Sequence, residues 1–266
     1  RNEAMSVRCV KNEASEISGI GDSSSFASSD KSLFLSSLPK ETFTDSRDGK
    51  IYGIVTIGYQ TWMSENLNFQ AANSYCYKDN PDNCATYGRL YTWSAAMDSI
   101  GDFSQHGKGC GDGKSCNPSY PVRGICPEGF HLPTAEEFKT LYAFAGGEHS
   151  AGKRLKSRSD WSGWSTCRWE GRFFCKTSES GNGTDDYGFT MLPAGRWFGS
   201  FEYLHDEAFF WTSEAYSSGN GSTEYILGNA YATYLKYDSF MNMDNEGPYV
   251  KAFQKSNGFS VRCVKD

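Results

Sequence analysis

The sequence predicts an α+β fold with two helices, antiparallel strands and long loops pinned by disulfide bonds. Helical periodicity occurs in only two segments, and three of the five segments with strand signals follow them. Stretches rich in glycine, serine and asparagine separate these segments. Aromatic residues make up 15% of the chain, which supplies large side chains for a core although helices are few.

The stronger helical pattern lies within residues 130–147. Thr134 is a suitable N-cap, and Glu137 three residues later completes a capping box. An apolar stripe at helical spacing follows, and Gly146-Gly147 ends the helix. This stripe consists of Phe138, Leu141, Tyr142 and Ala145. The second helix is expected at about residues 90–99, where Trp93, Ala96 and Met97 share a face.

Strand signals dominate in the rest of the domain. The segments are short and are separated by loops rich in Gly, Ser and Asn. The predicted strands are Ile51–Ile57, Gln60–Met63, Ala208–Ser213, Ala230–Tyr237 and Gly258–Val264.

The 266 residues divide into a short strand, a linker and one folded domain. Residues 1–14 contain SVRCVK (residues 6–11), which occurs again at residues 260–265 and has the alternation of a strand with one buried face. Residues 15–42 form a Ser-rich linker, and residues 43–266 form the domain. We interpret the first SVRCVK as the end of a preceding tandem copy. A recently duplicated edge strand is the alternative interpretation.

Charge and hydropathy exclude two classes of protein. The chain has 26 basic and 32 acidic residues and a net charge of −6, which argues against nucleic-acid binding. No apolar run approaches the roughly 18 residues of a membrane-spanning helix. The N-terminus lacks a basic region followed by an apolar one, so we expect any export signal to have been removed or to lie upstream.

The nine cysteines indicate disulfide bonds rather than a metal site. No C-x-x-C occurs, and the four histidines do not have zinc-ligand spacing. Three pairs lie close together in polar segments and predict short disulfide loops: Cys76 with Cys84, Cys110 with Cys116, and Cys167 with Cys175. Such loops indicate an oxidising environment, so we expect a secreted or cell-surface protein. Cys126 and Cys263 would then form a long-range bridge, and Cys9 would have no partner among these pairs.

An ordered series of motifs covers residues 43–266. The motifs are TDSRDGKIYGIVTIGYQTWMSENLNF (44–69), GRLYTWSAAM (88–97), CPEGFHLPTAEEF (126–138), GTDDYGFTMLPAG (183–195), FFWTSE (209–214), AYATYLKYDS (230–239) and GFSVRCVKD (258–266). Together they resemble the Fibrobacter succinogenes major paralogous domain, a repeated module of secreted and surface-anchored bacterial proteins. Segments 101–121 and 148–182 depart from this resemblance and look like cysteine-bearing loop insertions.

More distantly, the segment GFHLPTAEEF is similar to an element of formylglycine-generating enzymes and related C-type-lectin-like folds. The resemblance implies a C-type-lectin-like fold whose terminal strand is bridged to the body of the domain. The positions that match this bridge are Cys126 and Cys263. The family resemblance implies an architecture more than an activity.

No set of residues indicates catalysis. The chain has no spare cysteine pair for a formylglycine-generating site and no G-x-S-x-G nucleophile motif. A glycosidase needs two facing carboxylates, and the obvious acidic doublets are Glu136-Glu137 and Asp185-Asp186. The capping box explains Glu137. Asp185 and Asp186 would either hydrogen-bond the turn before a buried strand or bind calcium, the one cofactor that we consider.

Clustered aromatic residues are the candidate ligand site. Flat rings stack on sugar rings, although they also cover the edge of a core. The candidate carbohydrate-binding residues are Trp164, Trp169, Trp197 and Tyr203. If a polysaccharide binds there, the three tryptophans should be partly exposed and roughly coplanar.

The sequence therefore favours a non-catalytic extracellular or cell-surface module for assembly or for adhesion, with polysaccharide as the candidate ligand. The alternative is a carbohydrate-active or formylglycine-generating-like enzyme. Assembly would use tandem copies or a homo-oligomer, and the SVRCVK strand and the linker would make the contact and form a filament. The candidate assembly residues are Val7, Cys9, Phe26, Leu33, Phe34 and Leu35.

Overall fold

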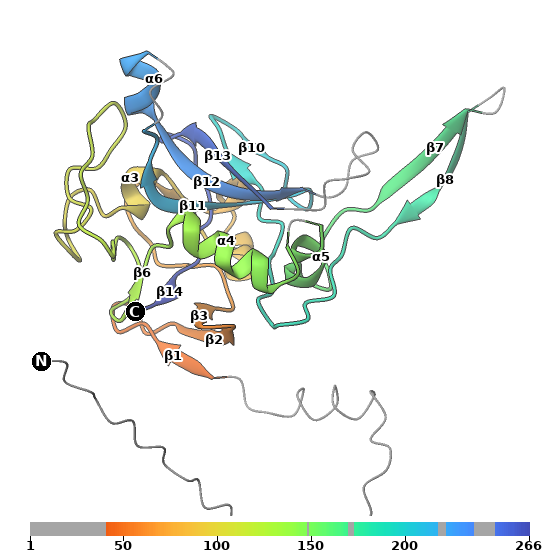
Figure 1. Ribbon diagram of the computed structural model, residues 1–266, viewed down its shortest axis with the longest axis horizontal. Helices are drawn as coiled ribbons and strands as arrows, with labels where there is room; N and C mark the ends of the chain where they lie inside the picture. Colours follow the sequence, from red (N-terminus) through yellow and green to blue (C-terminus); the bar gives the residue numbers. More distant parts are fainter. Residues whose placement is uncertain (1–40, 148, 170–172, 218–221, 237–247) are drawn as a thin grey trace, which may run out of the picture. The chain divides into compact units, whose positions relative to one another are not determined.

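The computed structural model describes residues 41–147, 149–169, 173–217, 222–236 and 248–266, and only the backbone within residues 164–179. All of these residues belong to one compact unit, Lys40–Asp266. The unit combines short helices with small sheets, and every pairing between its named strands is antiparallel. These features confirm the α+β prediction (Figure 1).

The elements follow in chain order. The helices are η1 (Tyr77–Asp79, a 3₁₀ turn), α2 (Pro81–Tyr87), α3 (Trp93–Ala96), α4 (Ala135–Phe144), α5 (Ala151–Leu155) and α6 (Thr223–Gly228). The strands are β1 (Thr42–Thr44), β2 (Ile51–Ile57), β3 (Gln60–Met63), β4 (Ser74–Tyr75), β5 (Leu90–Tyr91), β6 (Phe130–His131), β7 (Trp164–Trp169), β8 (Phe173–Glu179), β9 (Arg196–Trp197), β10 (Phe201–Glu202), β11 (Glu207–Ala215), β12 (Asn229–Lys236), β13 (Tyr249–Gln254) and β14 (Val264–Lys265).

Both predicted helices are present, and the structure adds α2, α5 and α6. Helix α4 begins with the predicted capping box, in which Thr134 and Glu137 bond each other's backbone N–H groups. Helix α3 is shorter than the predicted 90–99. It ends early because Asp98 adopts a left-handed backbone conformation and its carboxylate accepts three backbone N–H bonds from the next loop.

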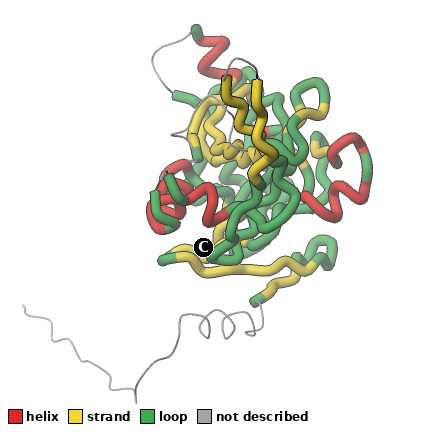
Figure 2. The backbone as a smooth tube through the Cα atoms, turned by 90° about the vertical axis from the view of Figure 1, so that its right-hand side faces the viewer, coloured by secondary structure: helices red, strands yellow, loops and turns green. Residues whose placement is uncertain are grey.

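Two sheets organise the domain. One has five strands in the order β1-β2-β3-β14-β6, and the other has three strands in the order β11-β12-β13. The predicted strands Ile51–Ile57 and Gln60–Met63 match β2 and β3 residue for residue. Figure 2 shows strands β1 and β2 at the end of the unit opposite to α6, so the two ends carry different structures.

The closing segment differs from its prediction. Gly258–Val264 was expected to form one strand with one buried face, but it makes isolated bridges and only Val264–Lys265 is a strand. Every residue from Gly258 to Val264 is buried, so the alternation of SVRCVK does not mark an exposed face. The prediction is wrong here because the segment passes through the core, where both sides are covered, and only its end, at Val264, pairs with β3 and β6.

Arg262 shows how this segment is held. Its side chain is fully buried and lies 4.6 Å from the centroid of the Phe189 ring. The guanidinium donates hydrogen bonds to Asn66 Oδ1 and to backbone carbonyls, which are those of Met63, Phe189 and Thr190. Burial lowers the pKa of Arg262 to about 9, so the group is still a cation at neutral pH. A buried charge surrounded by acceptors fixes several segments at once.

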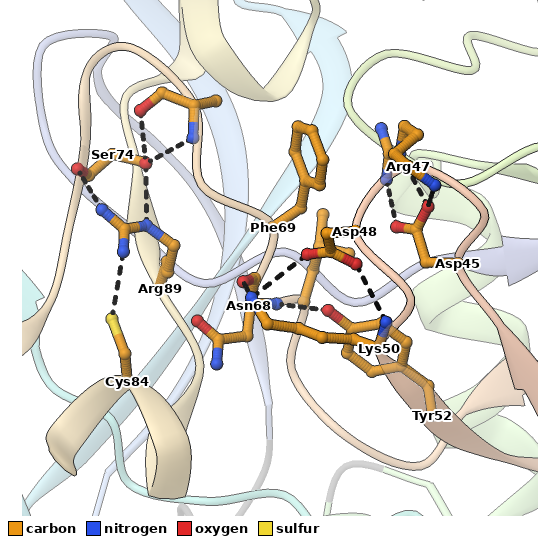
Figure 3. Close-up of polar contacts among 12 residues, drawn as sticks. Asp45, Arg47, Asp48, Lys50, Tyr52, Asn68, Phe69, Ser74, Cys84 and Arg89 are labelled. Atoms are coloured by element: carbon orange, nitrogen blue, oxygen red, sulfur yellow. Dashed lines mark hydrogen bonds and ion pairs between the residues drawn. The ribbon is translucent and has the colours of Figure 1, made fainter. Parts of the chain in front are cut away.

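Three of the four predicted disulfide bonds are present: Cys76–Cys84, Cys110–Cys116 and Cys126–Cys263. The long-range bridge joins residues 137 positions apart. For the fourth pair, the structure describes the backbone, in which Cys167 lies directly opposite Cys175. Figure 3 shows Arg89 pointing toward Ser74 and Cys84, and its contacts connect the first bridge to β4. In the same view Lys50 lies between Asp48 and the backbone of Asn68.

Candidate functional site

The predicted aromatic platform is only partly exposed. Trp197 is half-buried and stacks on Tyr75, with 4.8 Å between the ring centroids and 19° between the planes. One face of its ring is therefore already covered by the protein. Tyr203 is 42% exposed and packs 4.7 Å from the guanidinium of Arg196. The side chains of Trp164 and Trp169 lie outside the described part of the chain, so the coplanarity of the three tryptophans stays a prediction.

The two aspartates of the predicted calcium site are occupied by protein partners. Both carboxylate oxygens of Asp185 accept hydrogen bonds from Thr190, one from the backbone and one from the hydroxyl. This is the turn-stabilising role that was the alternative to calcium. Asp186 pairs with Arg154 at 2.8 Å. The described residues contain no group of three or more His, Cys, Asp or Glu side chains that could hold a metal ion.

The six candidate assembly residues, from Val7 to Leu35, lie outside the residues that the structure describes. Their roles stay predictions. In the part of the chain that was searched, no helix has the length and apolar character needed to cross a membrane.

The structure contains a polar, aromatic-lined pocket that the sequence did not indicate. Its volume is about 800 Å³, and we call it the tyrosine pocket. It lies among the loop closed by Cys110–Cys116, the first turn of α4, the end of β11 and helix α6. The side chains that define its character are Tyr120, Lys139, Glu214, Tyr216 and Tyr231. In Figure 1 this loop, drawn in yellow, and α6 lie at the same end of the unit.

The tyrosines form the aromatic wall of the pocket. The rings of Tyr216 and Tyr231 are 5.5 Å apart, and Tyr120 is 54% exposed. Burial raises the pKa of Tyr120 and of Tyr231, and the negative charge of Glu214 raises both further. Both phenols are therefore neutral at physiological pH and keep hydroxyl groups that donate and accept hydrogen bonds.

Glu214 connects the pocket to helix α4. Its Oε2 accepts a hydrogen bond from the backbone N–H of Ala135, the first residue of that helix, at 2.8 Å. A carboxylate is stabilised at a helix N-terminus because the free N–H groups point toward it. This contact orients the acidic side chain beside Tyr120 and Tyr231.

Lys255 ties two walls of the pocket together. The side chain is 1% exposed, and its Nζ donates to the carbonyls of Gly111 and Lys114 in the disulfide loop and of Leu227 in α6, at 3.1, 3.3 and 2.6 Å. The ammonium also lies 4.7 Å from the centroid of the Trp93 ring. Burial lowers the pKa of Lys255. One buried cation thus holds the loop and the helix in a fixed relation.

Sequence reasoning missed this site because its residues are scattered. Tyr120, Tyr216 and Tyr231 lie in a loop, after β11 and within β12, and no spacing rule links them. Tyr231 lies in the motif AYATYLKYDS (230–239), which predicts a strand but does not indicate a pocket. The arrangement presents rings, neutral hydroxyls, one carboxylate and lysines, which suits a ligand with apolar faces and many hydroxyl groups.

Comparison with known proteins gives one match. A family model for the Fibrobacter succinogenes major domain matches residues 55–265. No curated protein and no solved structure matches the chain, so the C-type-lectin-like architecture stays a prediction. Because the matched segment spans most of the 266 residues, the chain belongs to the Fibrobacter succinogenes major domain family.

Proposed function

We propose that this protein is a non-catalytic extracellular module that binds a polysaccharide through the tyrosine pocket. The observation that carries the proposal is the pocket itself, which is lined by three tyrosines and Glu214 and whose disulfide loop and α6 are tied together by Lys255. A pre-organised site loses little conformational entropy on binding, which favours affinity. The three disulfide bonds support an oxidising compartment such as the cell exterior.

The charges in the pocket favour binding over hydrolysis. Glycosidases place two carboxylates on opposite sides of the scissile bond. Among the described residues that line the tyrosine pocket, Glu214 is the single acidic side chain, and it is committed to the N-terminus of α4. The tyrosine side chains, of which Tyr120 is 54% exposed, supply the surface that a sugar chain would contact.

The test is retention on polysaccharides. The purified chain is run by affinity electrophoresis through gels containing xylan, galactomannan or polygalacturonate, and is sedimented with swollen cellulose. We expect retention by at least one of the four, and a loss of affinity of about tenfold or more for Tyr231→Ala, as for an aromatic anchor. Tyr59→Ala is the matched control because Tyr59 is fully exposed and does not line the pocket.

Two outcomes would contradict the proposal. One is free migration in all three gels together with no sedimentation on cellulose. The other is an equal loss for Tyr59→Ala and Tyr231→Ala. Release of reducing sugar from the retained polysaccharide would instead support the alternative, a carbohydrate-active enzyme.

Assembly is a second candidate function, and the SVRCVK repeat favours it. In the copy at residues 260–265, the last two residues pair with β3 and β6, and the segment is fixed by Arg262 and by the Cys126–Cys263 bridge. A second segment with the same sequence needs a comparable core around it, and a neighbouring copy would supply one. Deletion of residues 1–41 followed by light scattering tests this: the same number of subunits per particle in the full-length and the truncated protein would rule out assembly through this segment.

A further inference from the structure

A second pocket lies on the other side of α6. Its volume is about 570 Å³, and it is lined by polar residues that include Asp112, Glu224, Asn229 and Gln254. None of its described lining residues is a lysine or an arginine. Carboxylates and amides in such a setting hydrogen-bond hydroxyl groups.

The two pockets are built from alternating residues of the same segments. In the disulfide loop, Asp112 and Gly113 line the second pocket, whereas Lys114 and the next residues line the tyrosine pocket. At the end of β13, Gln254 lines the second pocket and Lys255 lines the first. Among the described residues, helix α6 and the tip of the loop therefore contribute to both pockets, and Lys255 joins these two structures.

A row of aromatic rings connects the pockets. Tyr231 and Tyr216 line the tyrosine pocket, with 5.5 Å between their rings. Tyr216 then meets Tyr225 edge to face at 5.4 Å. Tyr225 lines the second pocket and is 47% exposed. Tyrosine rings therefore run from one pocket to the other, each in contact with the next.

We propose that the two pockets are subsites of one extended glycan-binding site, whose ligand is a stretch of several sugar units rather than a single sugar. This inference rests on the proposed function, because it assumes that the tyrosine pocket binds a polysaccharide. The glycan would contact Tyr231, Tyr216 and Tyr225 in turn as it crosses α6. The amides and carboxylates of the second pocket then contact the units beyond Tyr225.

Calorimetry with size-fractionated oligosaccharides tests this inference. Disaccharides to octasaccharides are prepared from the polysaccharide that the chain retains. We expect affinity to rise at least tenfold from the disaccharide to the hexasaccharide and then to level off. Gln254→Ala should abolish this gain and leave disaccharide affinity unchanged. Gln254 is exposed, so its removal should not disturb folding. Tyr231→Ala should weaken oligosaccharides of every length.

The outcomes separate the two proposals. If no oligosaccharide of any length binds, the proposed function fails. If disaccharide and octasaccharide bind equally well, the proposed function stands and the second subsite is wrong. A length effect that survives both Gln254→Ala and Tyr225→Ala would also overturn it, because the additional units would then bind elsewhere.

Discussion

Two buried cations hold opposite parts of this domain, and they do so in the same way. Neither Arg262 nor Lys255 forms an ion pair with a described residue, and both donate mainly to backbone carbonyls. The partners of Arg262 belong to the core around the closing segment. Those of Lys255 belong to a surface loop and to α6, which form the walls of a pocket. The same kind of interaction therefore stabilises the core in one region and shapes the tyrosine pocket in the other.

The two regions differ in what the loss of the cation would do to its backbone acceptors. Irregular segments leave backbone carbonyls without ladder partners, and a buried cation satisfies several of them at once. In the core, loss of the cation leaves buried acceptors with no access to water. At the pocket, water reaches the same kind of acceptor more easily. We therefore expect Arg262 to govern stability and Lys255 to govern ligand binding.

The largest expected effect is loss of the Cys126–Cys263 bridge. The chain-entropy relation gives about 5 kcal/mol for its loop and about 2 kcal/mol for the Cys110–Cys116 loop, because the sequence separations are 137 and 6. Urea unfolding of the two double serine variants measures both losses. Removal of the short bridge should also lower polysaccharide affinity. Equal stability losses would show that the closing segment is not the more strongly held region.

Next in size is Arg262→Met. Removal of the guanidinium leaves three buried acceptors, the Met63 and Phe189 carbonyls and Asn66 Oδ1, without their donor, so we expect a loss of about 3–5 kcal/mol in stability. Chemical denaturation measures it. Lys265→Met, a change at an exposed position of the same segment, is the control and should have almost no effect. A loss below about 1 kcal/mol for Arg262→Met would contradict a central role for this cation.

Lys255→Met should separate binding from stability. Three carbonyls lose their donor, but those of Lys114 and Leu227 are only partly buried, so we expect a loss of about 1–3 kcal/mol in stability. Polysaccharide affinity should fall about tenfold as the loop and α6 lose their fixed relation, equivalent to about 1.4 kcal/mol. Affinity electrophoresis at a temperature where the variant is folded measures this. Unchanged affinity would mean that Lys255 does not position the walls of the pocket.

The smallest effect is a pH dependence at His131. Burial disfavours its charged form, but hydrogen bonds from the ring nitrogens to Glu137 and Asp266, at 2.8 and 2.7 Å, outweigh this and raise the pKa of His131. A raised pKa in the folded state adds stability that is fully present below about pH 6.5 and is lost as the pH rises through the folded pKa. Urea midpoints between pH 5.5 and 8.5 should fall for the wild type and stay level for His131→Gln.

The sequence predicted the regular elements better than the pocket. Strands β2 and β3 and the capping box of α4 depend on local patterns, which are visible in consecutive residues. The closing segment has the same alternation as a one-sided strand, and the pattern does not reveal that Arg262 is buried. The position of Lys255 depends on contacts with Gly111 and Leu227, which are 144 and 28 residues away. Such contacts follow from the packing of loops, for which no periodicity exists.

The central claim is that ligand binds at the tyrosine pocket, beside Lys255, and not at the closing segment that Arg262 holds. Hydrogen exchange measured by mass spectrometry, with and without the retained polysaccharide, tests this claim most directly. We predict that the ligand slows exchange in residues 110–120 and 222–231 and leaves residues 258–266 unchanged. Protection confined to residues 196–203, or absent from both pocket segments, would contradict the assignment of the site to the tyrosine pocket.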